Sequence, residues 1–99
     1  MVTNRTLFWA VDELPDSLVL RVRGQIDQET AAEFARAVRE TVGRGKATSI
    51  DLSAVTYLDG QGIGVLREHA NLTKATLKPS AQLRRALQTL GIEYLFKFQ

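Results

Sequence analysis

Few residues of this 99-residue chain have the types and spacing that a reaction requires. The single histidine, His69, directly follows Glu68, and adjacent helical residues do not share a face, so the pattern predicts an exposed histidine and no acid–base pair. The chain has no cysteine, which excludes a disulfide, a thiolate metal site and a cysteine nucleophile. We therefore expect no catalytic residue and no enzyme.

Two other patterns contain residue types that bind ligands. Asp27, Asp51 and Asp59 would hold Mg²⁺ only if their carboxylates met, and they stand at the ends of predicted elements in different parts of the chain. The run from Gly60 to Gly64 is rich in glycine, but no Lys-Ser/Thr pair follows it as a phosphate loop requires. We expect no metal and no cofactor. A nucleotide or small-ligand sensor remains a lesser alternative, because a helix N-terminus attracts anions.

Residues 50–66 predict the elements that present Asp59. Aliphatic residues indicate a buried strand over 47–52, and a short loop then leads to a helix. Asp59 and Gly62 form an Asp-x-x-Gly turn at the start of that helix. In this position Asp59 either caps the helix by accepting a main-chain hydrogen bond or contacts a partner directly.

Four further strands are predicted around this segment. Residues 7–11 are apolar, residues 18–24 alternate with period 2, and the turn at 12–17 joins them as a hairpin. Residues 74–78 predict a short strand, and residues 94–98 predict a final one. We expect a single α/β domain over residues 1–99, with a mixed sheet of about four to five strands and helices packed against it.

Capping signals predict two more helices. A capping box of Thr30 and Glu33 starts the first, which ends at one of the glycines in 43–45. Residues 79–80 start the second, which Gly91 ends. The predicted apolar stripes are Ala31, Phe34, Ala35, Val38 and Val42 in the first helix, and Leu83, Ala86, Leu87 and Leu90 in the second.

The composition is that of a globular protein, with 44% apolar residues and a net charge of +2. The half after Asp59 is basic, through Arg67, Lys74, Lys78, Arg84, Arg85 and Lys97. These cations are scattered, so we interpret them as solvated and expect no nucleic-acid partner. No run approaches the roughly 20 apolar residues of a membrane-spanning helix. We expect a cytoplasmic protein without direct membrane insertion.

Four segments in order carry a family resemblance. Besides the Asp-x-x-Gly turn, residues 20–27 read as a strand followed by Gly-x-Ile-Asp, residues 48–53 as a strand ending in Asp-Leu-Ser, and residues 79–92 as a helix ending in Leu-Gly-Ile. Over residues 7–98 the set resembles the STAS domains, the family of anti-sigma factor antagonists (anti-anti-sigma factors) and of regulatory modules on transporters.

The resemblance implies a non-catalytic regulatory module of bacterial type that binds a protein. The implied contacts are the loop residues Asp59, Gly60, Gln61 and Gly62 and the helix residues Ile63 and Arg67. Family members carry a phosphorylated Ser or Thr in this loop, and the added charge repels the partner. Here Gly60 and Gln61 occupy those positions, so we expect no phosphorylation at the loop. Gln61 indicates either permanent binding or a loss of regulation.

The implied partner is an anti-sigma factor of the GHKL kinase type. The alternative is an assembly role, as a STAS subunit that docks on the ATPase of an ABC-type lipid transporter or as a stressosome-like scaffold. The segment from Asp59 to Pro79 is shorter than the family's by about two helical turns. Either the helix stops near residues 69–71, or the strand at 74–78 is degraded.

Aromatic residues are predicted on the edge strands of the sheet. Trp9, Phe96 and Phe98 form either core contacts, which we favour, or an exposed binding patch. If the first strand lies at an edge, a homodimer that pairs through it is an open alternative.

Overall fold

The structure is a computed structural model that describes residues 6–70 and 75–98. Within these residues five strands form one sheet in the order β1-β2-β3-β4-β5, with β1 antiparallel to β2 and all other neighbours parallel. The strands are β1 (Leu7–Glu13), β2 (Ser17–Ile26), β3 (Ala47–Leu58), β4 (Thr76–Pro79) and β5 (Lys97–Phe98). The predicted α/β fold with a mixed sheet is confirmed.

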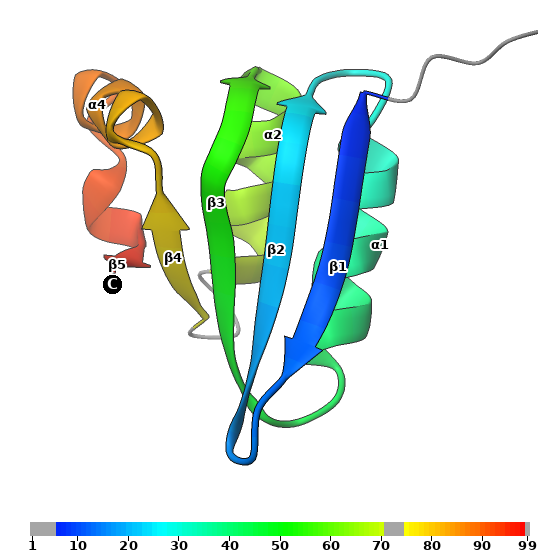
Figure 1. Cartoon of the computed structure of the whole chain (residues 1–99). Coiled ribbons are helices and arrows are strands. Elements are labelled where there is room, and N and C mark those ends of the chain that lie inside the picture. The colour runs from blue at the N-terminus through cyan, green and yellow to red at the C-terminus, as the bar shows by residue number, and fades with distance from the viewer. Residues whose placement is uncertain (1–5, 71–74, 99) are drawn as a thin grey trace, which may run out of the picture.

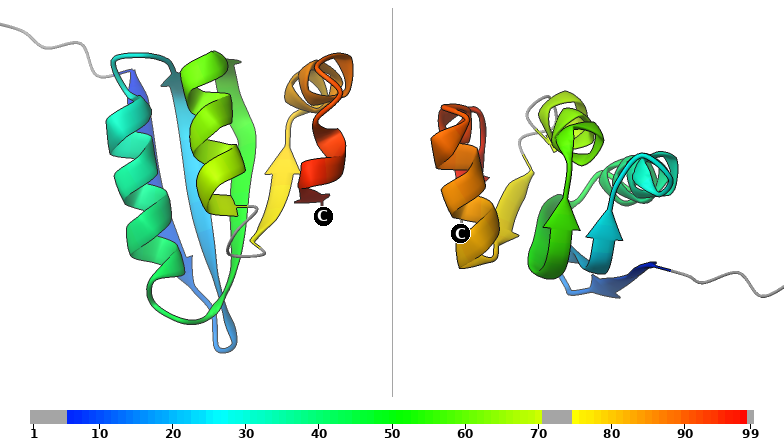
Figure 2. Two further views of the ribbon diagram at one scale, coloured as in Figure 1. Left: turned by 180° about the vertical axis from the view of Figure 1, so that it is seen from behind. Right: turned by 90° about the horizontal axis from the view of Figure 1, so that it is seen from above.

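Three α-helices of the described chain flank this sheet: α1 (Ala31–Val42), α2 (Gly60–Val65) and α4 (Ala81–Thr89). Helices α1 and α2 cover one face, behind the strands in Figure 1 and in front of them in the left view of Figure 2. Helix α4 lies beside the sheet, next to the end of β4. In the described part of the chain, no helix covers the opposite face of β1, β2 and β3.

The core lies between the sheet and the two helices on its covered face. Leu18, Leu20 and Val22 alternate along β2 and are buried, as the period of 2 predicts. Phe34 and Val38 of α1 are fully buried and join the same hydrophobic cluster as Leu20 and Val22. The alternation in β2 and the spacing in α1 therefore fix which faces meet.

The start of α1 differs from the predicted capping box. The Thr30 side chain makes no cap hydrogen bond to the helix. Its hydroxyl accepts the main-chain N–H of Asp27 (2.9 Å) and donates to the Gln25 carbonyl (3.0 Å). The Asp27 carboxylate accepts the N–H groups of Glu29 (2.9 Å) and Thr30 (3.2 Å), because a short acidic side chain reaches the main chain two and three residues ahead. Gly43, one of the two predicted glycines, caps the other end.

The buried face of α1 also differs from the predicted stripe. Phe34 and Val38 are buried as predicted, but Ala37 and Thr41 are fully buried in place of the other predicted members, which are half-buried. Thr41 is tolerated there because its hydroxyl donates to the Ala37 carbonyl at 2.7 Å.

Strand β3 is twice as long as predicted. The expected strand covered residues 47–52 with a loop after it, whereas β3 continues to Leu58. Pairing with β2 extends to the end of β3, through two register shifts. The sequence pattern misses this extension because the polar Ser53 and the small Ala54 interrupt the run of large apolar residues. Pairing with the neighbouring strand β2 keeps the main chain extended around these residues.

The C-terminal elements need two corrections. Of the predicted stripe of α4, Leu83 and Leu87 are buried, but Ala86 and Leu90 are exposed. The predicted final strand over 94–98 is reduced to β5, and a 3₁₀ turn over Glu93–Leu95 precedes it.

Helix α4 ends as predicted at Gly91, which has a φ of +70°. The N–H of Gly91 donates to the Gln88 carbonyl (3.0 Å) and that of Ile92 to the Leu87 carbonyl (3.1 Å). These two bonds form a Schellman motif, which needs a left-handed residue at this position and so favours glycine.

Candidate partner-binding site

The Asp59 turn joins the end of β3 to α2. The Asp59 carboxylate accepts the main-chain N–H groups of Gln61 (2.9 Å) and Gly62 (3.2 Å), so Asp59 is the N-cap of α2. The main-chain N–H of Asp59 donates to the Ile26 carbonyl at the end of β2 (3.1 Å). The turn is therefore held to the sheet through its main chain and to the helix through its side chain.

Gly62 brings α2 close to the sheet. A Cβ atom at this position would lie 2.7 Å from Cγ2 of Ile26 and 3.0 Å from Cγ of Leu58, closer than carbon atoms pack. Gly60 and Gly64 face open space, so a methyl group fits at either one. Of the three glycines in this helix, only Gly62 is required by packing.

The other predicted contact residues differ in exposure. Gln61 and Arg67 are exposed, and Ile63 is half-buried. Gln61 therefore presents a neutral amide, which can both donate and accept hydrogen bonds, at the place where the helix begins.

A π-helical turn over Leu66–Ala70 continues α2. Leu66 is fully buried and anchors this turn to the core, and the turn contains both Arg67 and His69. For the two alternatives of the short segment, helical structure extends to Ala70, within the range where the helix was expected to stop, and the predicted strand at 74–78 is present as four residues, Thr76–Pro79. Lys74, the first residue of the predicted strand, lies outside the described residues. No sequence pattern predicted the π-helical geometry.

All three helices begin at the same edge of the sheet, where the parallel strands β2, β3 and β4 end. Each start has its own polar side chain: Asp27 before α1, Asp59 before α2, and Ser80, whose hydroxyl accepts the N–H of Leu83 at 3.1 Å, before α4. This edge is where open α/β sheets generally place their binding sites.

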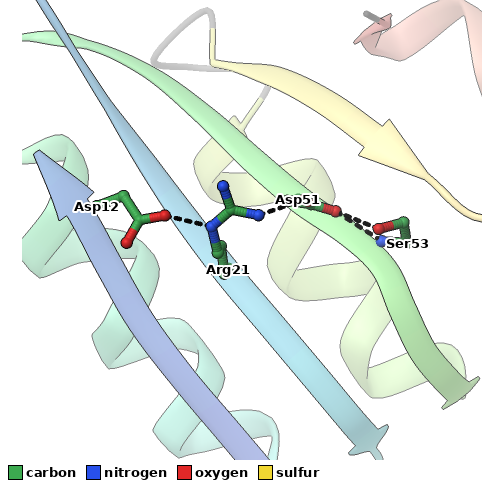
Figure 3. Close-up of polar contacts among 4 residues, drawn as sticks. All are labelled: Asp12, Arg21, Asp51 and Ser53. Carbon is green, nitrogen blue, oxygen red and sulfur yellow. Dashed lines mark hydrogen bonds and ion pairs between the residues drawn. The ribbon is translucent and has the colours of Figure 1, made fainter. Parts of the chain in front are cut away.

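Sequence reasoning missed a polar network on the uncovered face of the sheet. Arg21 of β2 bonds to Asp12 of β1 and, at 3.5 Å, to Asp51 of β3 (Figure 3). Asp51 also accepts the main-chain N–H (3.0 Å) and the hydroxyl (2.6 Å) of Ser53. Arg21 and Asp51 are direct cross-strand partners in the β2–β3 register. The sequence shows only that an arginine and an aspartate stand on two separate strands, and the ion pair between them follows from the register of those strands.

The network shifts the pKa values of two groups. Burial raises the pKa of the Asp51 carboxyl, but the hydrogen bonds from Ser53 and the charges of Lys78 and Arg21 outweigh it, so the pKa lies below its ordinary value. The hydrogen bond to Asp12 raises the pKa of Arg21. Asp51 therefore stays ionised in the folded protein at neutral pH.

The three aspartates considered as a metal site serve separate roles. Asp27 and Asp59 organise helix starts, and Asp51 joins the network on the sheet. Among residues 6–70 and 75–98, no three acidic, histidine or cysteine side chains are grouped to hold a metal ion. In the same residues, no helix has the length and apolar content needed to cross a bilayer.

Edge-strand positions are confirmed for Trp9 and Phe98, because β1 and β5 are the two outer strands of the sheet, but Phe96 precedes β5 and is not in a strand. Phe96, just before β5, is buried, and Trp9 and Phe98 are half-buried against the core. Self-association through β1 stays a prediction.

The described residues form an α/β domain with a mixed five-stranded sheet and a capped turn where the parallel strands end. The family described as "Mlab, STAS domain" matches residues 9–96, and the chain therefore belongs to the STAS domain family. The chain matches none of the curated proteins.

Solved structures agree with this assignment. An anti-sigma factor antagonist from Mycobacterium paratuberculosis is 25% identical, with a TM-score of 0.75, over 94% of this chain and 85% of that one. The unphosphorylated form of the anti-sigma factor antagonist SpoIIAA is 13% identical, with a TM-score of 0.65, over 93% of this chain and 88% of that one. A putative antagonist from Thermotoga maritima is 19% identical, with a TM-score of 0.67, over 91% and 84%. At these lower identities the two latter structures show the fold alone.

Proposed function

We propose that this chain is a non-catalytic regulatory module that binds a protein partner in the cytoplasm, as an anti-sigma factor antagonist does. The observation that carries the proposal is the Asp59 turn, which is fixed to β2 and to α2 and presents an exposed Gln61. A surface already held in one conformation loses little conformational freedom on binding, which favours affinity.

The proposed contact surface consists of the turn and the helix that follows it: Asp59, Gly60, Gln61, Gly62, Ile63 and Arg67. The preferred partner is an anti-sigma factor of the GHKL kinase type. Because Gly60 and Gln61 have no hydroxyl, we propose that phosphorylation at this turn does not control binding.

A second candidate is an assembly subunit that docks on the ATPase of an ABC-type lipid transporter or in a stressosome-like scaffold. The same two residues favour it, since a structural subunit has no need of a phosphorylatable group at the turn.

Purification of the tagged full chain from its host, with and without ATP, separates these candidates. Recovery of a soluble GHKL-type ATPase supports the first, and recovery of an ABC ATPase with its permease supports the second. If direct binding measurements with both classes of partner detect no complex, neither proposal holds.

Substitutions at Gln61 test the contact surface. Gln61→Glu adds a negative charge where family members are phosphorylated, and we expect at least about tenfold weaker partner binding. Gln61→Ser restores a hydroxyl, and we expect a kinase partner to phosphorylate it. Gln88→Glu, the same change at an exposed position of α4, is the control. If both Gln61 variants bind like the parent chain, the turn is not the interface.

A further inference from the structure

Strand β3 has an unpaired edge where β4 stops. Strand β4 pairs with β3 only from Ser49 to Leu52, whereas β2 pairs with the other edge of β3 as far as Leu58. Within the described residues no strand lies against the β4-side edge of residues 54–58. In the part of the chain that the structure describes, the main-chain N–H and carbonyl groups on that edge therefore have no strand partner.

A groove with a volume of about 250 Å³ lies along this edge. One wall consists of four consecutive residues, 55–58. Consecutive residues of a strand alternate between the two faces of the sheet, so a cavity that touches all four follows the edge of the strand. Figure 1 and the left view of Figure 2 show α4 beside this part of β3, beyond the end of β4.

Helix α4 and its N-cap supply the other wall through Ser80, Gln82, Leu83 and Ala86. The spacing of three from Ser80 to Leu83 to Ala86 places these residues on one side of the helix. Leu90, one turn beyond Ala86 on this side, is 57% exposed, and Tyr57 on the strand wall is 53% exposed. Of the two members of the predicted apolar stripe that the core leaves exposed, Ala86 lines the groove and Leu90 follows it at the end of α4.

The helix wall of the groove is positively charged. Residues 54–58 and α4 contain no acidic side chain, and Arg85, which precedes Ala86 in the chain, is exposed. At the end of the strand wall, the negatively charged Asp59 accepts the N–H groups of Gln61 and Gly62 and so points toward the start of α2. An acidic side chain on a bound segment therefore complements the helix wall.

We propose that the groove between β3 and α4 binds an extended segment of a partner protein, which adds to β3 as a strand. Its main chain pairs with residues 54–58, an apolar side chain enters the groove, and an acidic side chain lies near Arg85. Main-chain pairing provides affinity, and the α4 wall provides selectivity. The surface is separate from the Asp59 turn and does not depend on the partner proposed for that turn.

A random heptapeptide library displayed on phage, selected against the folded full chain, is the first test. We expect enriched peptides that combine apolar and acidic residues and that shift the NMR signals of residues 54–58 and of α4. Alternate main-chain amides within 54–58 become protected from hydrogen exchange on binding. Selection without enrichment, or peptides that shift other residues, overturns the proposal.

N-methylation of the enriched peptides tests strand addition directly. Methylation of amides that pair with β3 weakens binding about tenfold each, because one main-chain hydrogen bond is lost. Methylation of the intervening amides, which point away from β3, leaves the affinity unchanged. Equal effects at all positions contradict strand addition.

Two variants test the α4 wall. Ala86→Trp fills the groove and is expected to weaken peptide binding at least about tenfold, whereas Ala32→Trp, the same change at an exposed position of α1, has no effect. Arg85→Glu is expected to weaken the binding of acidic peptides selectively. Thermal unfolding verifies that each variant is folded. Should both wall variants bind like the parent chain, the groove is not the site.

Discussion

Two residues, Asp59 and Gly62, determine the shape of the candidate site at the residue scale. Asp59 occupies the free N–H groups at the start of α2, and Gly62 lets the helix approach Ile26 and Leu58. Gly60 and Gln61, which occupy the positions where family members are expected to carry Ser or Thr, make no comparable packing demand, since both are exposed. The packing of the turn therefore does not depend on which residues stand at these two positions.

Gly62→Ala is predicted to destabilise the fold by about 1–3 kcal/mol, because the new methyl group overlaps Ile26. Gly60→Ala and Gly64→Ala, which face open space in the same helix, are matched controls and are expected to stabilise the protein by up to about 1 kcal/mol. Urea denaturation measures all three. Equal effects at the three positions would contradict the packing role of Gly62.

Asp59→Ala is predicted to cost about 1 kcal/mol of unfolding free energy through loss of the N-cap, while Asp59→Asn retains most of it. The pair separates two roles. If Asp59 only caps α2, the Asn variant also keeps partner binding. Weak binding by a stable Asn variant would show that the carboxylate itself contacts the partner.

Asp51 predicts a pH dependence of stability. Its pKa in the folded protein lies below the unfolded value, so the folded state holds fewer protons and the stabilisation is present above the unfolded pKa of about 3.9. It is lost as the pH falls through the lower, folded pKa. We expect wild-type stability to fall below about pH 4 more steeply than that of Asp51→Asn, as measured by urea denaturation between pH 2.5 and 6.

The length of each strand relative to its neighbours is decisive at the element scale. Strand β3 extends beyond the point where its pairing with β4 ends. This difference in length leaves room for the groove beside α4 and places the Asp59 turn beyond the end of β4. The start of α1 shows a similar dependence on context, because the Asp27 turn takes the place of a local capping box.

Asp27→Ala is predicted to destabilise the fold by about 1–2 kcal/mol, since it removes the acceptor of two main-chain N–H groups ahead of α1. Asp16→Ala, in the exposed turn between β1 and β2, is the control and is expected to change stability by less than about 0.5 kcal/mol. Thermal or urea unfolding distinguishes them. An unchanged stability for the Asp27 variant would contradict the role of its carboxylate at the start of α1.

At the scale of the whole molecule, the helices cover the two faces of the sheet unequally. Two helices cover one face, polar residues such as Arg21 and Asp51 occupy the other, and the starts of all three helices gather at one edge. The two proposed binding surfaces lie near this edge, one at the Asp59 turn and one between β3 and α4.

Strand β1 predicts a further property of the whole molecule. Among the described residues it pairs only with β2, and it contains neither the proline nor the lysine that often protect edge strands. We expect the chain to form a homodimer at high concentration through this edge. Sedimentation velocity over a range of concentrations tests this expectation, and a monomer at every concentration contradicts it.

The sequence by itself determined the local features: the alternation in β2, the burial of Phe34 and Val38, the Asp59 cap, the Gly91 helix end and the order of elements that defines a STAS domain. The first four features depend on residues that are close together in the sequence, so a short sequence pattern can predict them. The order of elements follows from reading such local patterns one after another along the chain. Tertiary structure alone decided the length of β3, the start of α1, the exposure of Ala86 and Leu90, and the Arg21–Asp51 pair. These features depend on which strand lies beside which and in what register, because neighbours distant in sequence provide the hydrogen bonds and cover the side chains.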